Sequence, residues 1–311
     1  MKYLYHYCSN QTLYQILRSS SLRMSDISKS NDYKELNLFF PGIFRSIMKL
    51  YKENVFPFSY RNMKDEEAVS ELLTQSYKIW NEKFESGDFL NYVACFSEKE
   101  DSLNQWRSYA DNGRGCCIGF SKADIESYCK ASNGVIRLEK VNYISDDELK
   151  QKVDEHAEEI LGKLKIFGAS EEKSDDFLSY SFNSIIENIF INSLTYKSDA
   201  IEEEREWRIF LSNGAYREKE LVISGENNKK ITGSDGFSET IQFLKDRIEI
   251  VASENDFITY CPLLFSEFCE NPVKEIWIGP KNIARKADVQ FLIDTLDYGT
   301  CRIYFSKISY F

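Results

Sequence analysis

Two glutamates that lead into an apolar stretch have the types and spacing of a reactive site. Glu204 and Glu206 stand just before Trp207, Arg208 and Ile209. Side chains two residues apart on a β-strand point to the same face, so we expect both carboxylates and Arg208 on one side. Two carboxylates that converge on one ligand can hydrogen-bond a sugar hydroxyl and stabilise a developing cation. An ion-pair ladder with Arg208 explains the same spacing, and both interpretations stay open.

A histidine in an aromatic strand near the start of the chain is a second candidate. His6 lies between Tyr5 and Tyr7, and Ser9 follows two residues later. Backbone pairing on both sides of a strand would hold the ring in place, so that its nitrogens could be aimed at ribose hydroxyls, with Tyr5 and Ser9 beside the ligand. A hydrogen-bonded core histidine explains the same pattern. The other histidine, His156, stands among acidic residues and is interpreted as solvated surface.

The segment Ser97–Gly115 combines a polar loop, a short aromatic helix and a glycine turn between two apolar stretches. Trp106 is expected in the core, while Tyr109, three residues on, could show its hydroxyl at the edge of a cavity. Arg114 could meet a phosphate, because the glycines on either side allow close approach of a ligand. An ordinary hairpin turn also uses such glycines. Ser97, Tyr109 and Arg114 are therefore the site candidates of this segment.

A polar loop near residue 30 offers a further set of ligand-orienting groups. Asn31, Asp32 and Glu35 lead into an expected helix. Asn31 and Asp32 could bind a ligand, or they could cap the helix with Glu35 completing a capping box. The sequence does not decide between the two.

Cysteine and histidine usage argues against a metal site. The eight cysteines are scattered without a CxxC pair, and there are only two histidines. A structural zinc site needs four such ligands, so none is expected. Several cysteines stand in apolar strands, and we interpret them as reduced, buried thiols of a cytoplasmic protein.

The negative net charge of the chain argues against some classes of binding partner. The net charge is −11, and no dense run of lysine and arginine is present. Binding to duplex DNA or to a membrane surface is therefore not expected, although a small anionic ligand needs only a local pocket. The start of the chain lacks an apolar run, so we expect no signal peptide, and no stretch is long enough to span a membrane.

The pattern of expected strands and helices that must position these residues predicts an α+β fold. Strands are irregularly interspersed with helices, unlike the regular alternation of a doubly wound sheet. We expect a single domain over residues 1–311, with a central mixed or antiparallel, split sheet, peripheral helices and helical insertions at about 36–90 and 146–196. The expected strands are 3–8, 22–24, 92–97, 116–120, 135–144, 206–211, 248–252, 275–278 and 301–305. Ser9-Asn10 offers an N-cap for a first helix, in which Leu13, Ile16 and Leu17 follow at helical spacing. The other expected helices are 34–52, 66–86, 101–110, 146–165, 173–196, 238–247 and 284–296.

Taken together, these motifs resemble the bacterial family called domain of unknown function 2971. The shared motifs, in chain order, are Tyr5-His6-Tyr7-x-Ser9, Leu22-x-x-Ser25-Asp26, Asn31-Asp32-x-x-Glu35, Phe96-Ser97, Trp106-x-x-Tyr109-Ala110, Gly115, Ile118-Gly119-Phe120, Glu204-x-Glu206-Trp207-Arg208 and Ile278-Gly279-Pro280. They span most of the chain. Cys8 departs from the pattern, because a threonine is common there. This resemblance implies no activity.

More distantly, the order of residues is similar to that in the ADP-ribosyltransferase superfamily. That resemblance implies a histidine on an early strand for the nicotinamide ribose, a tyrosine or serine beside nicotinamide, and a late glutamate that stabilises the oxocarbenium-like state. His6, then Ser97 or Tyr109, then Glu206 or Glu204 follow that order. It implies NAD as a substrate and ADP-ribosyl transfer or NAD hydrolysis, in a toxin or an anti-phage effector. Arg114 or Arg208 could then pair the pyrophosphate of NAD.

Two other classes of function fit the same residues. A non-catalytic module could use the pocket to sense a nucleotide or a protein. Alternatively the motifs could serve folding alone, with function on a partner surface. The sequence does not name an acceptor for the transferred group.

Overall fold

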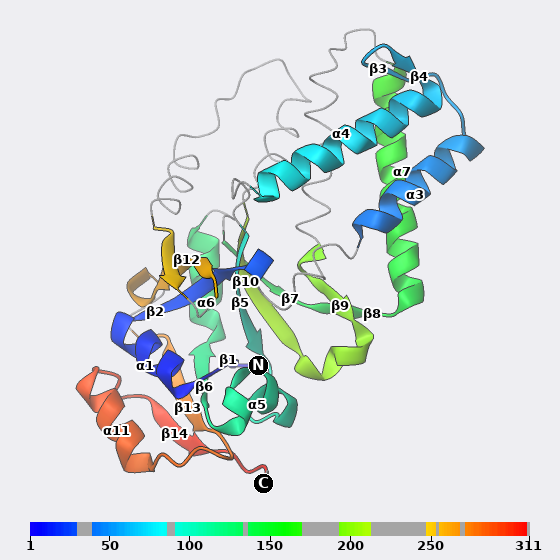
Figure 1. The fold of residues 1–311 in the computed structure, drawn as a ribbon. Coiled ribbons are helices and arrows are strands. Elements are labelled where there is room, and N and C mark those ends of the chain that lie inside the picture. Colours follow the sequence, from blue (N-terminus) through cyan, green and yellow to red (C-terminus); the bar gives the residue numbers. More distant parts are fainter. Residues whose placement is uncertain are drawn as a thin grey trace.

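A mixed ten-stranded sheet forms the centre of this α+β fold (Figure 1). The computed structural model describes residues 1–29, 39–85, 91–132, 136–169, 193–212, 247–252, 255–267 and 271–309. The strands are β1 (Tyr3–Cys8), β2 (Ser21–Asp26), β5 (Asn91–Ser97), β6 (Cys116–Ser121), β7 (Ile136–Lys140), β10 (Glu206–Ser212), β11 (Glu249–Ala252), β12 (Phe257–Leu264), β13 (Val273–Ile278) and β14 (Arg302–Phe305).

The sheet runs in the order β11-β12-β2-β5-β1-β6-β13-β14, and β10 joins β5 to β7. All neighbours are antiparallel except β13 and β14. The sheet forks at β5. One edge of β5 pairs with β10 from Asn91 to Ser97, while the other edge pairs with β2 only at Tyr92 and Val93 and with β1 only at Ser97. Between these two pairings, β1 and β5 diverge.

Four helices of the described residues lie close to the sheet. They are α1 (Asn10–Ser19), α5 (Leu103–Tyr109), α6 (Lys122–Ala131) and α11 (Lys286–Thr295). Helix α1 begins as the sequence predicts, because the Ser9 hydroxyl accepts a hydrogen bond from the backbone N–H of Thr12 at 3.1 Å. Short 3₁₀ turns complete this part of the fold: η1 (Ile27–Lys29), η2 (Asp111–Gly113), η3 (Asp199–Glu204) and η4 (Phe265–Glu267).

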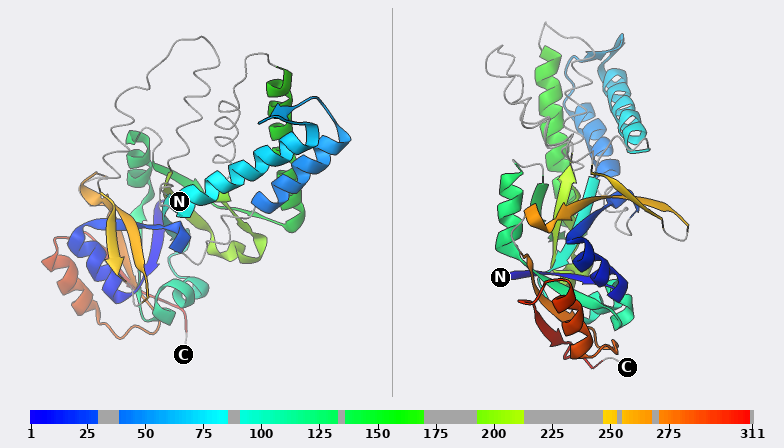
Figure 2. Two further views of the ribbon diagram at one scale, coloured as in Figure 1. Left: turned by 45° about the horizontal axis from the view of Figure 1, so that its top comes forward. Right: turned by 90° about the vertical axis from the view of Figure 1, so that its left-hand side faces the viewer.

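Three longer helices form an arm that projects from the sheet (Figures 1 and 2). They are α3 (Phe40–Glu53), α4 (Asp65–Glu85) and α7 (Asp146–Ala169). The hairpin of β3 (Ser59–Tyr60) and β4 (Met63–Lys64) precedes α4, and the parallel pair of β8 (Asn142–Ile144) and β9 (Tyr196–Ser198) flanks the segment that contains α7. The described helices of this arm fall within residues 36–90 and 146–196.

The alternation of side chains along the strands gives the sheet two different faces. Leu4 and Cys8 of β1 pack into the main core with α1, α6 and α11, whereas Tyr5 and Tyr7 pack into an aromatic cluster under α5. In β10, Phe210 packs instead into the core of the arm. One face therefore carries the main core, and the opposite face carries the arm core and the aromatic cluster side by side along the sheet.

Several predicted elements differ from the structure. The expected strand 135–144 is two strands, β7 and β8, in separate sheets. The strand β12 was not predicted, since Pro262 interrupts its pattern; its pairing with β11 ends at Tyr260, so Pro262 faces β2 on one edge alone. The predicted helices 173–196 and 238–247 lie almost entirely outside the described residues, and residues 196–198 form β9.

The interpretation of His156 as solvated surface was wrong. Its ring is half-buried on α7 and meets the edge of Phe39 at a centroid distance of 5.8 Å. The seven cysteines within the described residues are free thiols, and five of them are buried. Within the same residues, no helix is long and apolar enough to cross a membrane.

Candidate functional site

A small cavity of about 70 Å³ lies at the fork of the sheet, where β1 and β5 diverge. Strand β1, strand β5, helix α5 and the start of β10 all contribute to its wall. The lining residues are Tyr5, His6, Tyr7, Cys95, Phe96, Gln105, Tyr109, Glu204 and Glu206. Five candidates from three distant parts of the sequence therefore meet around one cavity: Tyr5, His6, Tyr109, Glu204 and Glu206.

His6 is held by the gap in the β5 ladder. Its Nδ1 lies 2.9 Å from the carbonyl oxygen of Cys95, a group on the edge of β5 between the β2 and β1 pairings. A carbonyl only accepts, so Nδ1 donates. Burial lowers the pKa of His6, which keeps the ring neutral near pH 7 and leaves Nε2 as an acceptor. The ring can therefore accept a hydrogen bond from a ligand hydroxyl.

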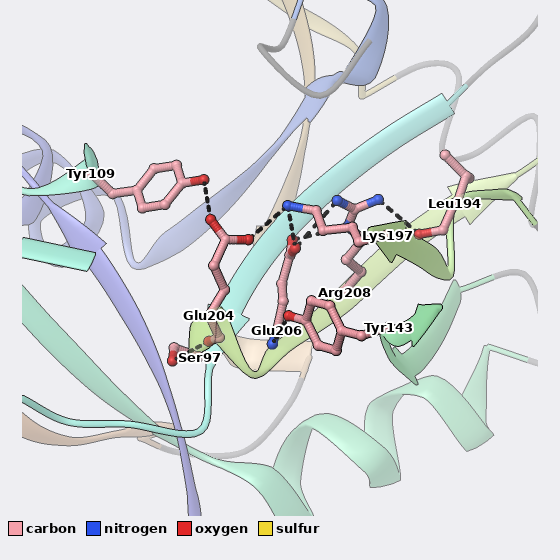
Figure 3. A network of polar contacts seen from close by, with 8 residues as sticks. All are labelled: Ser97, Tyr109, Tyr143, Leu194, Lys197, Glu204, Glu206 and Arg208. Atoms are coloured by element: carbon pink, nitrogen blue, oxygen red, sulfur yellow. Dashed lines mark hydrogen bonds and ion pairs between the residues drawn. The ribbon is translucent and has the colours of Figure 1, made fainter. Parts of the chain in front are cut away.

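Glu206 is part of a buried ion-pair network (Figure 3). Its carboxylate accepts from Arg208 Nε at 2.9 Å and from Lys197 Nζ at 2.8 Å. Burial raises the pKa of Glu206, but the two cations lower it further than burial raises it, to about 2. Glu206 is thus ionised near neutral pH, and both of its oxygens are engaged.

Arg208 does not reach the cavity. Its side chain is fully buried, and in addition to Glu206 it donates through Nη1 to the carbonyl oxygen of Leu194 at 2.8 Å. The expectation that Arg208 could pair a pyrophosphate is corrected by this placement. The sequence left two interpretations open, a ligand-binding pair of carboxylates and an ion-pair ladder with Arg208. The ion-pair ladder describes the contact between Glu206 and Arg208.

Glu204 has a different position from the one predicted. It is the last residue of η3 rather than part of the strand, and Arg205 turns the chain in a left-handed conformation with φ of 46°. The carboxylate of Glu204 nevertheless comes close to that of Glu206, because Lys197 Nζ bridges them at 2.9 Å from Glu204 Oε2. The Tyr109 hydroxyl lies 3.3 Å from Glu204 Oε1 (Figure 3). Glu204 is therefore the carboxylate that faces the mouth of the cavity.

Lys197 was missed by the sequence reasoning. It directly follows the predicted helix 173–196 and received no role, whereas it lies on β9 with 1% of its surface exposed. Burial of a lysine requires paired carboxylates, which Glu204 and Glu206 supply. The hydroxyl of Tyr143 on β8 adds a further constraint, since it accepts from the backbone N–H of Glu206 at 2.9 Å. The β8–β9 pair thus holds the acidic end of the cavity.

The aromatic wall is fixed by hydrogen bonds that point away from the cavity. The Tyr7 hydroxyl donates to the carbonyl oxygen of Lys99 at 2.8 Å, and the Tyr5 hydroxyl donates to Glu275 Oε2 at 3.1 Å. Trp106 is fully buried, as predicted for a core residue. Tyr109 remains 43% exposed, so its hydroxyl stands at the entrance. Gln105, the buried neighbour of Trp106, lines the cavity and was not predicted.

The remaining candidates lie outside the cavity wall. Ser9 caps α1, and the Ser97 hydroxyl donates to the backbone carbonyl of Glu204 at 2.7 Å, so it positions η3. Arg114 is exposed and pairs with Asp111 at 2.9 Å. The glycine turn beside it serves packing, because a side chain at Gly115 would collide with the carbonyl oxygen of Cys8. The candidates Asn31 and Asp32 fall outside the described residues.

A second, more open groove of about 490 Å³ adjoins the cavity. Glu204 belongs to both, so the two hollows share a wall. The groove lies between α5 and η3 and is mostly polar. Its lining residues are Asn104, Arg107, Ser108, Asn112, Ile201, Glu203 and Glu204.

Comparison with known proteins gives one match. No curated protein and no solved structure matches the chain. Residues 105–209 match the model of a family described as protein of unknown function DUF2971. This region includes Gln105, Tyr109, Lys197 and both glutamates of the cavity, whereas His6 precedes it. Over this part of its length, the chain is similar to the DUF2971 family.

Proposed function

We propose that the cavity binds the nicotinamide end of NAD and that the protein breaks the N-glycosidic bond, either hydrolysing NAD or transferring ADP-ribose to an acceptor. The observation that carries this proposal is the convergence of His6, Tyr109 and Glu204 from three distant elements around one cavity. Their order along the chain is that of the ADP-ribosyltransferase superfamily, which supports the proposal by resemblance.

The residues at the cavity have the chemistry for this reaction. When the bond between C1′ and the pyridine nitrogen breaks, its electron pair leaves with neutral nicotinamide, and positive charge develops on the ribose. A carboxylate close to that charge stabilises it, and Glu204 is the carboxylate at the mouth. Water or an acceptor hydroxyl then forms the new C1′–O bond and loses a proton to Glu204 or to solvent. The neutral His6 ring would accept a hydrogen bond from a ribose hydroxyl.

The sizes of the two hollows suggest how the rest of the dinucleotide would bind. A volume of about 70 Å³ is far below the roughly 300 Å³ of a pocket that encloses a whole drug-sized ligand, so only a ring would enter the cavity. The adjoining groove would take the diphosphate. There, the exposed guanidinium of Arg107 replaces Arg114 and Arg208 as the candidate phosphate ligand.

The direct test is release of nicotinamide from NAD by the purified protein, with and without cell extract as a source of acceptors. We expect release by the parent protein and its loss in Glu204→Gln. Glu202→Gln, a change in an exposed carboxylate of the same turn that is outside the lining of both hollows, is the matched control. No release under any condition, together with no calorimetric binding of NAD, would refute the proposal. If the protein acts as a toxin or an anti-phage effector, its expression should also deplete cellular NAD, and Glu204→Gln should not.

One observation favours the alternative of a non-catalytic nucleotide-sensing module. Lys197 Nζ contacts both carboxylates, so it offsets part of the negative charge that would stabilise a cation. A sensor would bind NAD without releasing nicotinamide, and Glu204→Gln would change its affinity but no rate of turnover. Calorimetry on the parent protein together with product analysis separates the two functions.

A further inference from the structure

Gln105 brings a side-chain amide to the cavity wall, where it forms no hydrogen bond with another of the described residues. Its side chain is 7% exposed and lines the cavity. The other buried polar side chains at this site are all paired: Ser97 with the Glu204 carbonyl, and Glu206 with Lys197 and Arg208. The amide atoms of Gln105 are not sealed off from the cavity, so a molecule that enters the cavity can form hydrogen bonds with them.

The position of Gln105 is rigidly defined. Its neighbour Trp106 is fully buried, donates through Nε1 to Asp101 at 2.7 Å, and packs edge-to-face on Tyr7 with a centroid distance of 4.8 Å. These contacts anchor α5 against β1. A side chain on such a helix holds its amide in a fixed place before any ligand binds, which favours selective recognition.

The chemistry of the amide determines what it can recognise. A glutamine side chain offers N–H donors and a carbonyl acceptor next to each other. A primary carboxamide on a ligand satisfies both at once. A carboxylate satisfies only the donors and sets an anionic oxygen against the glutamine carbonyl, in a cavity that Glu204 and Glu206 already line.

The rest of the wall suits a flat ring. Tyr5, Tyr7 and Phe96 line the cavity with aromatic surface, and the tyrosine hydroxyls are turned to Glu275 and Lys99 rather than to the ligand space. The narrow volume leaves room for one small ring and no larger group. An aromatic ring with a single carboxamide matches both the surface and the hydrogen-bonding groups.

We propose that Gln105 is the residue that selects nicotinamide over nicotinic acid, and hence NAD over its acid analogue. This inference rests on the proposed function, because it names the group by which the same cavity recognises its substrate. It assigns no bond-breaking role to Gln105.

The test compares the binding of free nicotinamide and of nicotinic acid to the full-length protein by calorimetry and ligand-observed NMR. We expect the parent protein to prefer nicotinamide by about tenfold or more, since a site built to hydrogen-bond a group rejects an analogue that lacks it. Gln105→Met keeps the length and removes the amide, so it should bind both ligands weakly and alike. Gln75→Met on α4, where the amide is bonded to Glu71, is the matched control and should keep the preference.

Each outcome decides a different question. If Gln105→Met keeps the parent's affinity and preference, the role of Gln105 is overturned while the proposed function stands. If the parent protein binds neither NAD nor nicotinamide, the proposed function fails and the inference fails with it. If Gln105→Met does not fold, Gln105→Asn is used instead, because it keeps the amide but withdraws it by one methylene. An unchanged preference in Gln105→Asn would then overturn the inference.

Discussion

The imidazole Nδ1 of His6 lies 2.9 Å from the carbonyl oxygen of Cys95, in the part of the β5 edge that neither β1 nor β2 pairs. A side chain thus fills a place that a backbone N–H takes elsewhere in the sheet. His6 therefore has a role in the sheet as well as in the cavity.

The first prediction concerns pH. Burial lowers the pKa of His6 below 6.5, so the unfolded chain binds a proton at a pH at which the folded chain does not. The stability that this neutral ring contributes is fully present above pH 6.5 and is lost as the pH falls below that value. For this one group, the slope of the unfolding free energy against pH has an upper limit of about 1.4 kcal/mol per unit. Urea denaturation between pH 7.5 and 5 measures it.

His6→Asn should reduce that slope, because an asparagine amide can still donate to the Cys95 carbonyl but does not titrate. The half-buried His156 also has a lowered pKa, with the same sign, so His156→Asn is the comparison. Identical slopes in His6→Asn and the parent protein would contradict the assignment of a buried neutral ring.

The second prediction concerns the ion-pair network. Glu206→Gln removes one charge from a buried cluster and leaves Arg208 and Lys197 with less compensation. Breaking a buried pair from one side costs about 3–5 kcal/mol, so the unfolding free energy should fall by that amount. Glu203→Gln, at an exposed position, should change it by less than about 0.5 kcal/mol. Equal effects of the two changes in urea titrations would refute the structural role of Glu206.

The third prediction separates stability from activity at the mouth of the cavity. Tyr109→Phe removes only the hydroxyl that lies 3.3 Å from Glu204. At a side chain that is 43% exposed, the unfolding free energy should change by less than about 1 kcal/mol. Under the proposed function, nicotinamide release should fall by about tenfold or more, in line with the loss of one positioned polar group. Tyr14→Phe on the exposed side of α1 serves as the control for both measurements.

The fourth prediction uses two glycines in opposite environments. Gly115→Ala would drive a methyl group into the backbone of Cys8, so it should destabilise by about 3 kcal/mol or prevent folding. Gly162 lies within α7, and a methyl group added there would have no neighbouring atom within 4 Å, so Gly162→Ala should stabilise by about 0.5–1 kcal/mol. Thermal unfolding of both variants checks the contrast. A neutral Gly115→Ala would show that the turn has room the structure does not indicate.

Comparison of sequence and structure shows which features local pattern can predict. The Ser9 cap, the burial of Trp106 and the strand of β10 follow from spacing over a few residues, and all three are present. The contact of Glu206 with Lys197 could not be predicted, because it joins two elements through a strand pairing, β8 with β9, that only the folded chain creates. Gln105 was missed for a related reason: a glutamine on a short helix reveals no partner until the opposite wall is known.

The position of Lys197 on β9 has a mechanical consequence. The cation that balances Glu204 and Glu206 is supplied by a strand at the base of the helical arm, while Glu206 belongs to the sheet. Coulomb energies in a buried setting change steeply with separation. A displacement of β9 against β10 would therefore alter the electric field inside the cavity without moving any residue of its aromatic wall. The electric field at a bound ligand therefore depends on the position of the arm relative to the sheet.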